Sequence, residues 1–256
     1  MSDLDDLVDE WTLRPDGPAV RSDVLPVIAD GVPAVLKVGA HEHEHLALRR
    51  WNGDGAVRLL RADPHRRAVL VERLGTESLD GQWDIDACTV VAGLYARLHV
   101  PAMPQLPTLA TMLVTWADEL RALPRSAPIP RRMVEQVVTL CGELAAAPND
   151  VVLHGNLHYG NVLAADREPW LAISPRPVNG DPHFELAPML WTRWDELADA
   201  VRWGVRYRLS TLVDAAGLDE DLARAWVLVR VIRAAAVATD PAAVTRYVTL
   251  AKAVQD

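Results

Sequence analysis

The sequence predicts an α+β chain of two lobes, a small β-rich lobe over residues 1–74 and a larger helical lobe over residues 75–256. Three observations support this prediction. Hairpin signals between short apolar runs occur in the first seventy-odd residues. From Asp84 onward, apolar residues recur at helical spacing. With 256 residues, half of them apolar, the chain is long enough to bury a substantial core.

Composition and charge narrow the class of protein. The formal net charge of -9 argues against a broad nucleic-acid-binding surface. The acidic start, Met1–Asp6, lacks the features of a signal peptide, and no apolar run approaches the length of a membrane span. Cys88 and Cys141 lie in apolar helical patterns and are predicted to be buried thiols. We therefore expect a cytoplasmic protein that binds a small molecule and neither nucleic acid nor a membrane.

Turn residues and short apolar runs define the elements of the first lobe. Residues 1–12 predict a short acidic helix or arm, and Pro15–Pro18 predicts a turn. Asp30-Gly31 and Asp63-Pro64-His65 each separate two apolar runs, which predicts two hairpins. Apolar residues three apart predict a helix over His41–Trp51.

Helical spacing organises the second lobe. Asp84 is placed to cap the first helix, and apolar residues from Ile85 to Leu98 fall on one face of it. A strand is predicted at Trp170–Ile173. The other helical stretches lie at about 109–120, 133–144, 185–194, 196–216, 219–237 and 241–254. A cleft between the lobes is the default place for a ligand.

One stretch of the second lobe, His154–Leu163, has the outline of a phosphotransferase catalytic loop. It is a turn of small residues with two amide side chains, Asn156 and Asn161, and an apolar strand follows it. In protein-kinase-like enzymes a His-x-Asp-x-x-x-x-Asn spacing supplies a base from the Asp and a magnesium ligand from the Asn. Here the base position is Asn156, and Ser174 stands where the second magnesium ligand is expected.

Several segments together resemble aminoglycoside phosphotransferase-like kinases, most closely the streptomycin 6-kinase and hydroxyurea phosphotransferase group. They follow the order found in that family and span most of residues 33–190. The resemblance implies a protein-kinase-like two-lobed fold. The matching segments are Ala34–Lys37, Glu44–Trp51, Gly55–Leu60, Val71–Leu74, Leu153–Leu163 and Gly180–Pro188.

The resemblance also implies a nucleotide site. Lys37 would approach the α- and β-phosphates of ATP and pair with Glu44, because a strand-borne ammonium needs a carboxylate to hold its direction. The backbone of the segment Glu72, Arg73 and Leu74 would contact adenine. ATP and magnesium would be the cofactors of an active enzyme.

Roles at the catalytic loop follow from the same resemblance. Asn161 would bind magnesium. The family has an Asp at the position of Asn156, where it takes the proton of the acceptor hydroxyl, and another at Ser174, where it binds magnesium. His154 is expected to shape the loop by bonding to backbone, and His158 matches a His that often accompanies the family's Asp.

The acceptor pocket is expected after Gly180. Asp181 and Glu185 lie there, and Glu185 stands where the family has an Asp. Trp191 and Trp194 flank the same region. We interpret them as residues that pack in the core and at the rim of the pocket, in preference to a dedicated aromatic cage for the substrate.

Three functions remain open. A positioned base contributes about 10²–10⁴ in rate, and a hydroxyl is a poor ligand for a hard cation. The first hypothesis is therefore a degenerate kinase, a pseudokinase, that lacks efficient activity and binds a small molecule or partner in the cleft. The second is an active phosphotransferase with an alcohol acceptor, related to antibiotic resistance, that uses ATP and magnesium. The third is a repurposed enzyme that performs non-phosphoryl chemistry on a natural product.

Overall fold

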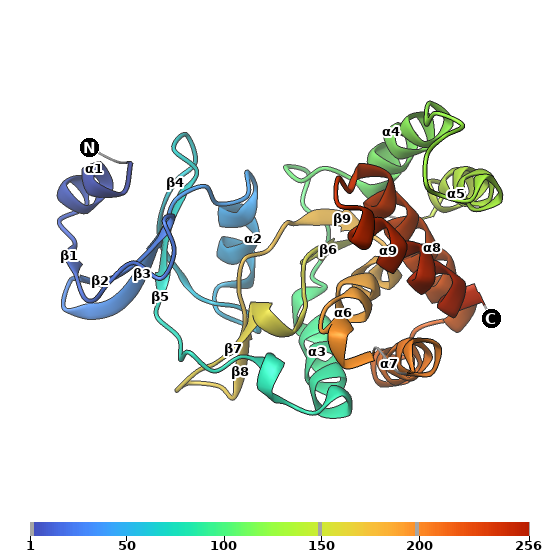
Figure 1. The fold of residues 1–256 in the computed structure, drawn as a ribbon. Coiled ribbons are helices and arrows are strands. Elements are labelled where there is room, and N and C mark those ends of the chain that lie inside the picture. Colours follow the sequence, from blue (N-terminus) through green and yellow to red (C-terminus); the bar gives the residue numbers. More distant parts are fainter. Residues whose placement is uncertain (1–2, 148–149, 198–199, 256) are drawn as a thin grey trace.

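A computed structural model of the chain describes residues 3–147, 150–197 and 200–255. It confirms the α+β fold class and the arrangement in two lobes, with a sheet at one end and helices at the other (Figure 1). None of the helices within these ranges is long and apolar enough to cross a lipid bilayer.

The small lobe is built on a five-stranded antiparallel sheet with the strand order β1-β2-β3-β5-β4. Helix α1 (Asp3–Glu10) packs against it through a small core that includes Leu7 and Leu36. The predicted hairpin at Asp30-Gly31 is confirmed, and both residues have positive φ, at 50° and 81°, as a tight turn that matches strand twist requires. The strands are β1 (Arg14–Pro15), β2 (Val24–Ala29), β3 (Val32–Lys37), β4 (Leu59–Asp63) and β5 (Ala68–Glu72).

Helix α2 (Glu44–Trp51) lies between the sheet and the helical lobe (Figure 1). It begins at Glu44 and not at His41, so the prediction of its start was wrong. Its buried face belongs to the large core of the helical lobe and not to the core of the sheet. Trp51 also donates a hydrogen bond from Nε1 to the carbonyl oxygen of Leu98, at 2.8 Å. Helix α2 is therefore attached to the helical lobe.

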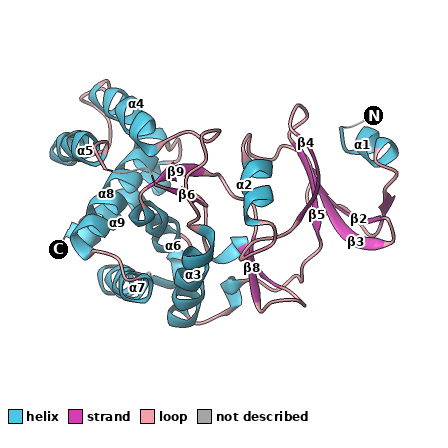
Figure 2. Ribbon diagram, turned by 180° about the vertical axis from the view of Figure 1, so that it is seen from behind, coloured by secondary structure: helices cyan, strands magenta, loops and turns pink. Residues whose placement is uncertain are grey.

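The helical lobe surrounds one large hydrophobic core (Figure 2). Its helices are α3 (Asp84–Leu98), α4 (Leu109–Arg121), α5 (Arg131–Leu144), α6 (Ala187–Trp191), α7 (Val201–Ala216), α8 (Glu220–Val237) and α9 (Pro241–Gln255). Two short antiparallel pairs lie beside them, β6 (Val151–Leu153) with β9 (Val178–Gly180) and β7 (Val162–Ala164) with β8 (Trp170–Ala172). Short 3-10 turns are η1 (Leu79–Gly81), η2 (Tyr159–Asn161), η3 (Pro182–Leu186) and η4 (Trp194–Leu197).

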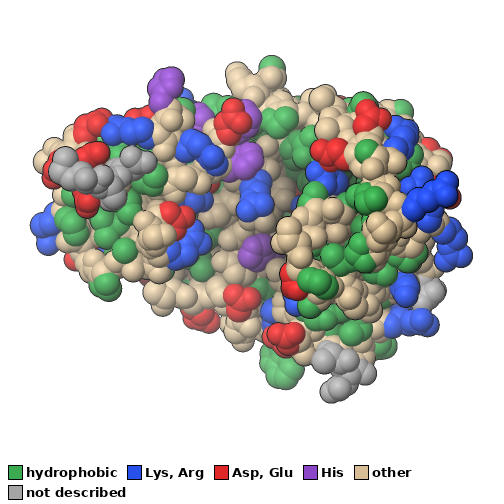
Figure 3. All heavy atoms as spheres, turned by 45° about the horizontal axis from the view of Figure 1, so that its top comes forward, with side chains coloured by type: hydrophobic (Ala, Val, Ile, Leu, Met, Phe, Trp, Pro, Cys, Tyr) green, Lys and Arg blue, Asp and Glu red, His purple; other side chains and the backbone are tan. Residues whose placement is uncertain are grey.

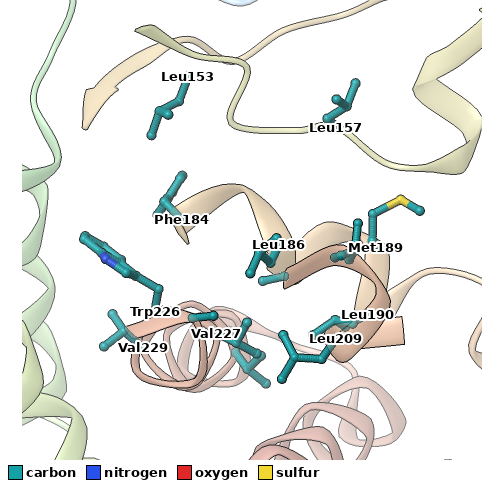
Figure 4. Packing of buried hydrophobic residues seen from close by; sticks show 14 of the residues in the cluster. Leu153, Leu157, Phe184, Leu186, Met189, Leu190, Leu209, Trp226, Val227 and Val229 are labelled. Carbon is teal, nitrogen blue, oxygen red and sulfur yellow. The ribbon is translucent and has the colours of Figure 1, made fainter. Parts of the chain in front are cut away.

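The core continues directly beneath the predicted catalytic loop (Figure 4). Leu153, at the end of β6, points toward Phe184 of η3, and Trp226 of α8 lies below them (Figure 4). Leu157 of the loop and Leu186 of η3 belong to the same core. All five side chains are buried. This apolar packing holds the loop in position on the helical lobe. Cys88 and Cys141 are buried free thiols, as predicted, and burial raises their pKa to about 12 and about 11.

Asp84 does not cap helix α3, which corrects the sequence-based expectation. The residue at the cap position is Trp83, and the Asp84 carboxylate turns inward. It accepts hydrogen bonds from Arg208 Nε at 2.8 Å and from the Tyr159 hydroxyl at 3.0 Å. Arg208 is only 1% exposed, and a buried guanidinium requires a carboxylate partner. Asp84 thus connects α3, the predicted catalytic loop and α7.

Candidate functional site: a cleft of the protein-kinase type

Lys37 lies at the centre of the candidate site. Its ammonium, at the end of β3, donates hydrogen bonds to the two carboxylate oxygens of Glu44 at 3.0 and 2.8 Å. It also lies 3.2 Å from the hydroxyl oxygen of Ser174, which follows β8 in the helical lobe. Glu44 is only 2% exposed, so this ion pair is largely desolvated. The structure therefore brings together three residues that the sequence had assigned to phosphate and metal positions.

His154 shapes the predicted catalytic loop through its two ring nitrogens. Nδ1 accepts a hydrogen bond from the backbone N–H of Asn156 at 3.3 Å, and Nε2 lies 3.1 Å from the carbonyl oxygen of Ile173. This arrangement requires the neutral imidazole with its proton on Nε2. Burial of the ring lowers the pKa of His154 to about 4. The ring of Trp51 stacks on it, with centroids 6.0 Å apart. His154 therefore bonds to backbone on both sides, as expected.

Glu185 holds the same loop from beneath. Its carboxylate accepts the backbone N–H groups of His154 and Gly155, the second at 3.0 Å, and the side chain is fully buried. Arg230 donates to the carbonyl oxygens of Gly155 at 3.0 Å and Phe184 at 2.7 Å. We expected Glu185 in the acceptor pocket, and this placement is corrected because both of its oxygens bind backbone inside the lobe.

Asn156 and Asn161 occupy the predicted base and metal positions. The side-chain Nδ2 of Asn161 donates to the backbone oxygen of Asn156 at 2.9 Å, which leaves the Asn161 amide oxygen as a potential ligand. Ser174 offers only a hydroxyl, and that hydroxyl is in contact with Lys37. No group of three or more His, Cys, Asp or Glu side chains in the described ranges could hold a metal ion. The residues present thus do not fit a magnesium site, because a hard divalent cation binds carboxylate oxygens.

The segment Glu72–Leu74, assigned to adenine, connects the lobes. The N–H of Glu72 donates to Arg58 and the N–H of Arg73 to Pro33, at 3.0 and 3.4 Å. The N–H of Leu74 has no hydrogen-bond partner among the described residues. The Glu72 side chain accepts from Arg167 at 2.6 Å, which ties the segment to the helical lobe. A donor at Leu74 is compatible with the expected adenine contact.

The two tryptophans of the predicted acceptor side are both half-buried. Trp191 is half-buried and packs edge-on against Tyr247, with ring centroids 5.8 Å apart. Trp194 is half-buried, and the Arg246 guanidinium lies over it at 5.9 Å. Both placements agree with core and rim packing.

Asp181 begins η3, where it accepts the backbone N–H of His183 at 2.9 Å. Burial opposes ionisation of Asp181, but its hydrogen bonds with the His183 ring and backbone outweigh burial and hold its pKa below the ordinary value. The His183 ring also accepts the N–H of Asp219 at 3.0 Å. Asp181 is therefore engaged in a structural contact.

Arg176 is a further charged residue near the predicted catalytic loop. Sequence reasoning did not assign Arg176, although a cation two residues after a predicted metal position was a signal. Arg176 is exposed, and its backbone N–H donates to the His154 carbonyl at 2.8 Å. The hollow between the lobes is flanked by basic and His side chains (Figure 3).

Comparisons with known proteins agree with this geometry. The family model of the aminoglycoside/hydroxyurea antibiotic resistance kinases matches residues 10–241. A streptomycin 6-kinase of Streptomyces glaucescens is 42% identical over 265 residues, which cover 94% of this chain and 86% of that protein. A hydroxyurea phosphotransferase of Kitasatospora aureofaciens is 40% identical over 245 residues, 89% of this chain and 70% of that protein.

Solved structures with low sequence identity to this chain have the same fold. Choline kinase LicA from Streptococcus pneumoniae superposes with a TM-score of 0.65 at 11% identity, over 98% of this chain and 96% of that one. A thermostable mutant of aminoglycoside phosphotransferase APH(4)-Ia, in a ternary complex with ADP and hygromycin B, gives 0.64 at 14% identity, over 100% of this chain and 97% of that one. The chain belongs to the aminoglycoside/hydroxyurea antibiotic resistance kinase family.

Proposed function

We propose that this protein is a degenerate member of its family, which binds a nucleotide-type ligand in the interlobe cleft and lacks efficient phosphotransfer. One observation carries the proposal. The Lys37–Glu44 pair is intact, whereas the hydroxyl of Ser174 stands against Lys37 at the predicted metal position. Asn156, at the predicted base position, carries no charge and accepts no proton.

The intact pair favours a retained phosphate site. Burying Glu44 and orienting Lys37 toward the cleft costs desolvation free energy. A protein that binds no anionic ligand would gain little from keeping this ion pair. The same ammonium can neutralise phosphate charge, as in related kinases. This argument counts against a purely non-phosphoryl use of the cleft.

The missing acids limit catalysis at two separate steps. Without a carboxylate at residue 156, no group at that position takes the acceptor proton, which costs about 10²–10⁴ in rate. Without one at residue 174, charge on the transferred phosphoryl group is poorly neutralised. The two losses need not multiply, but either one slows transfer strongly.

A turnover assay tests the proposal. Labelled ATP is incubated with magnesium and with streptomycin, hydroxyurea or another hydroxylated acceptor, and ADP and labelled acceptor are measured. The streptomycin 6-kinase of Streptomyces griseus, 42% identical over 242 residues, is the matched positive control. We expect product at a rate at least about a hundredfold below the control. Turnover at the rate of the control would refute the degenerate assignment.

A second candidate is an active alcohol-acceptor phosphotransferase. The observation that favours it is the 42% identity to a streptomycin 6-kinase across 94% of this chain. The orientation of Asn161, whose amide oxygen is left available, also supports it. The same assay separates the two functions, because the active enzyme would label one acceptor while Lys37→Met abolishes that labelling.

A further inference from the structure

The backbone of Arg176 is fixed to the predicted catalytic loop while its side chain is free. Its N–H donates to the His154 carbonyl, and its own carbonyl oxygen occupies the space where a side chain at Gly155 would start. Within the described ranges, the Arg176 guanidinium makes no hydrogen bond or ion pair. An exposed, unpaired cation on a fixed backbone is suited to binding an anionic ligand.

Backbone contacts place Arg176 at the cleft. It follows Ser174, whose hydroxyl lies 3.2 Å from the Lys37 ammonium, by two residues, and its own N–H binds the His154 carbonyl at 2.8 Å. Burial chiefly lowers the pKa of His158 in the catalytic loop, and the positive charge of Arg176 lowers it further. The pKa of His41, before α2 in the other lobe, is lowered by burial, by His43 and then by Arg176. The two shifts agree with a guanidinium on this side of the cleft, since His158 and His41 belong to different lobes.

Most of the negative charge among the described residues of this part of the cleft is already committed, although Glu42, exposed beside His41, also acts on that histidine. Glu44 binds Lys37 and also accepts the backbone N–H of His41 at 3.1 Å. Glu185 is buried under the loop, where it binds backbone. Asp80 acts on His158, but it is exposed and hydrogen-bonded to Ser78 at 3.0 Å. Asn156, Asn161 and Ser174 are neutral.

We infer that the cleft binds a polyphosphate anion directly, without a divalent cation, between Lys37 and Arg176. This inference rests on the proposed function and specifies its ligand chemistry. In an active kinase, carboxylates bind magnesium and magnesium binds the phosphates. Here the neutral side chains of Asn156 and Ser174 replace those carboxylates, so the anion meets no negative charge at the two positions where the metal would otherwise screen it. Arg176 supplies positive charge on the side of the cleft opposite β3, and its planar guanidinium suits phosphate oxygens.

Calorimetric titration of the full chain with inorganic tripolyphosphate and with ADP tests the inference. Each titration is performed in EDTA and again in excess magnesium. We expect binding in EDTA that is at least as tight as binding in magnesium, because magnesium removes charge from the ligand. Arg176→Gln is expected to weaken metal-free binding about tenfold, as loss of one charge-assisted hydrogen bond predicts. Arg121→Gln is the matched control, since Arg121 pairs with Asp118 on the surface of α4.

The variant Ser174→Asp provides a second, independent test of metal-free binding. A carboxylate beside Lys37 and Asn161 should weaken metal-free binding and make it respond to magnesium. Wild-type binding that occurs only with magnesium, or an equal affinity of the Arg176→Gln and Arg121→Gln variants, would overturn the inference and leave the proposed function standing. Absence of binding by ADP and tripolyphosphate under both conditions would overturn both.

Discussion

The Lys37 ammonium lies 3.2 Å from the Ser174 hydroxyl oxygen, although the two residues are 137 positions apart in the chain. Lys37 ends a strand of the sheet, and Ser174 follows a strand of the helical lobe. The contact therefore crosses the cleft. It places a neutral oxygen against the cation at the position where the family resemblance implies a carboxylate.

Restoring the two acids should restore catalysis. We expect Asn156→Asp combined with Ser174→Asp to raise turnover of labelled ATP with a hydroxylated acceptor by at least about a hundredfold. The backbone permits the second change, because Ser174 has φ 55° and Asp tolerates that left-handed region. Adding Lys37→Met to the double variant should abolish the gain. Unchanged turnover in a folded double variant would show that other parts of the site have also diverged.

Removing Lys37 should destabilise the fold through Glu44. Glu44 is 2% exposed, so Lys37→Met leaves a buried carboxylate without its counter-ion. Breaking a buried pair from one side typically costs about 3–5 kcal/mol in the free energy of unfolding. Glu44→Gln in the same chain removes the unpaired charge, so the double variant should be more stable than Lys37→Met alone. Urea denaturation measures all three, and a Lys37→Met variant as stable as wild type would contradict the prediction.

The free energy of unfolding should decrease as the pH is lowered, because His154 is buried as the neutral imidazole. Its pKa is about 4 in the folded protein, below the ordinary value of 6.5. The unfolded chain therefore binds the proton first, and folding stability is lost as the pH falls from about 6.5 toward 4. The shift corresponds to about 3 kcal/mol at most.

The pKa values of Asp181 and Glu185 are also lowered in the folded protein, so protonation of these carboxylates reduces folding stability further as the pH falls. The measurement is therefore a difference between variants, made by urea denaturation at several pH values. His154→Asn should show a shallower fall than wild type. The control is His65→Asn at an exposed turn, which should follow the wild-type curve. Parallel curves for His154→Asn and wild type would exclude His154 as the source.

Gly155 should tolerate no side chain. Its φ is +74°, and a Cβ would overlap the carbonyl oxygen of Arg176. Gly217, which ends α7, has a similar φ of +63°, but no atom lies within 4 Å of the point where its Cβ would be. Both Ala variants incur the left-handed strain, so their difference isolates the contact. We expect Gly155→Ala to lower the free energy of unfolding by about 1–3 kcal/mol more than Gly217→Ala does. An equal loss of unfolding free energy in the two variants would show that the loop shifts to make room for the Cβ.

Local signals predicted most of the fold. The Asp30-Gly31 hairpin depends on four neighbouring residues, and helical spacing depends on one face of one element, so both are visible in sequence. Hairpin signals and helical spacing also predicted the two lobes, and the family resemblance added the protein-kinase-like type of the fold. The boundary near residue 74 and the catalytic roles of Asn156 and Asn161 stay predictions.

Long-range partners explain what sequence reasoning missed. Asp84 was expected to cap a helix, but it binds Arg208, which is 124 positions away. Glu185 was expected at a pocket, but two backbone N–H groups of the loop draw its carboxylate into the core. Arg176 carries no periodic pattern, and only the fold shows that its backbone lies against His154. In each case the partner is set by tertiary packing.

The attachment of α2 to the helical lobe has a mechanical consequence. Trp51 bonds to Leu98 and stacks on His154, whereas the sheet has its own separate core. If the sheet swings outward, α2 stays behind, so the contact between Lys37 and Glu44 must stretch together with the contact between Lys37 and Ser174. The separation of the Lys37 and Glu44 side chains therefore reports directly on how far the sheet has rotated.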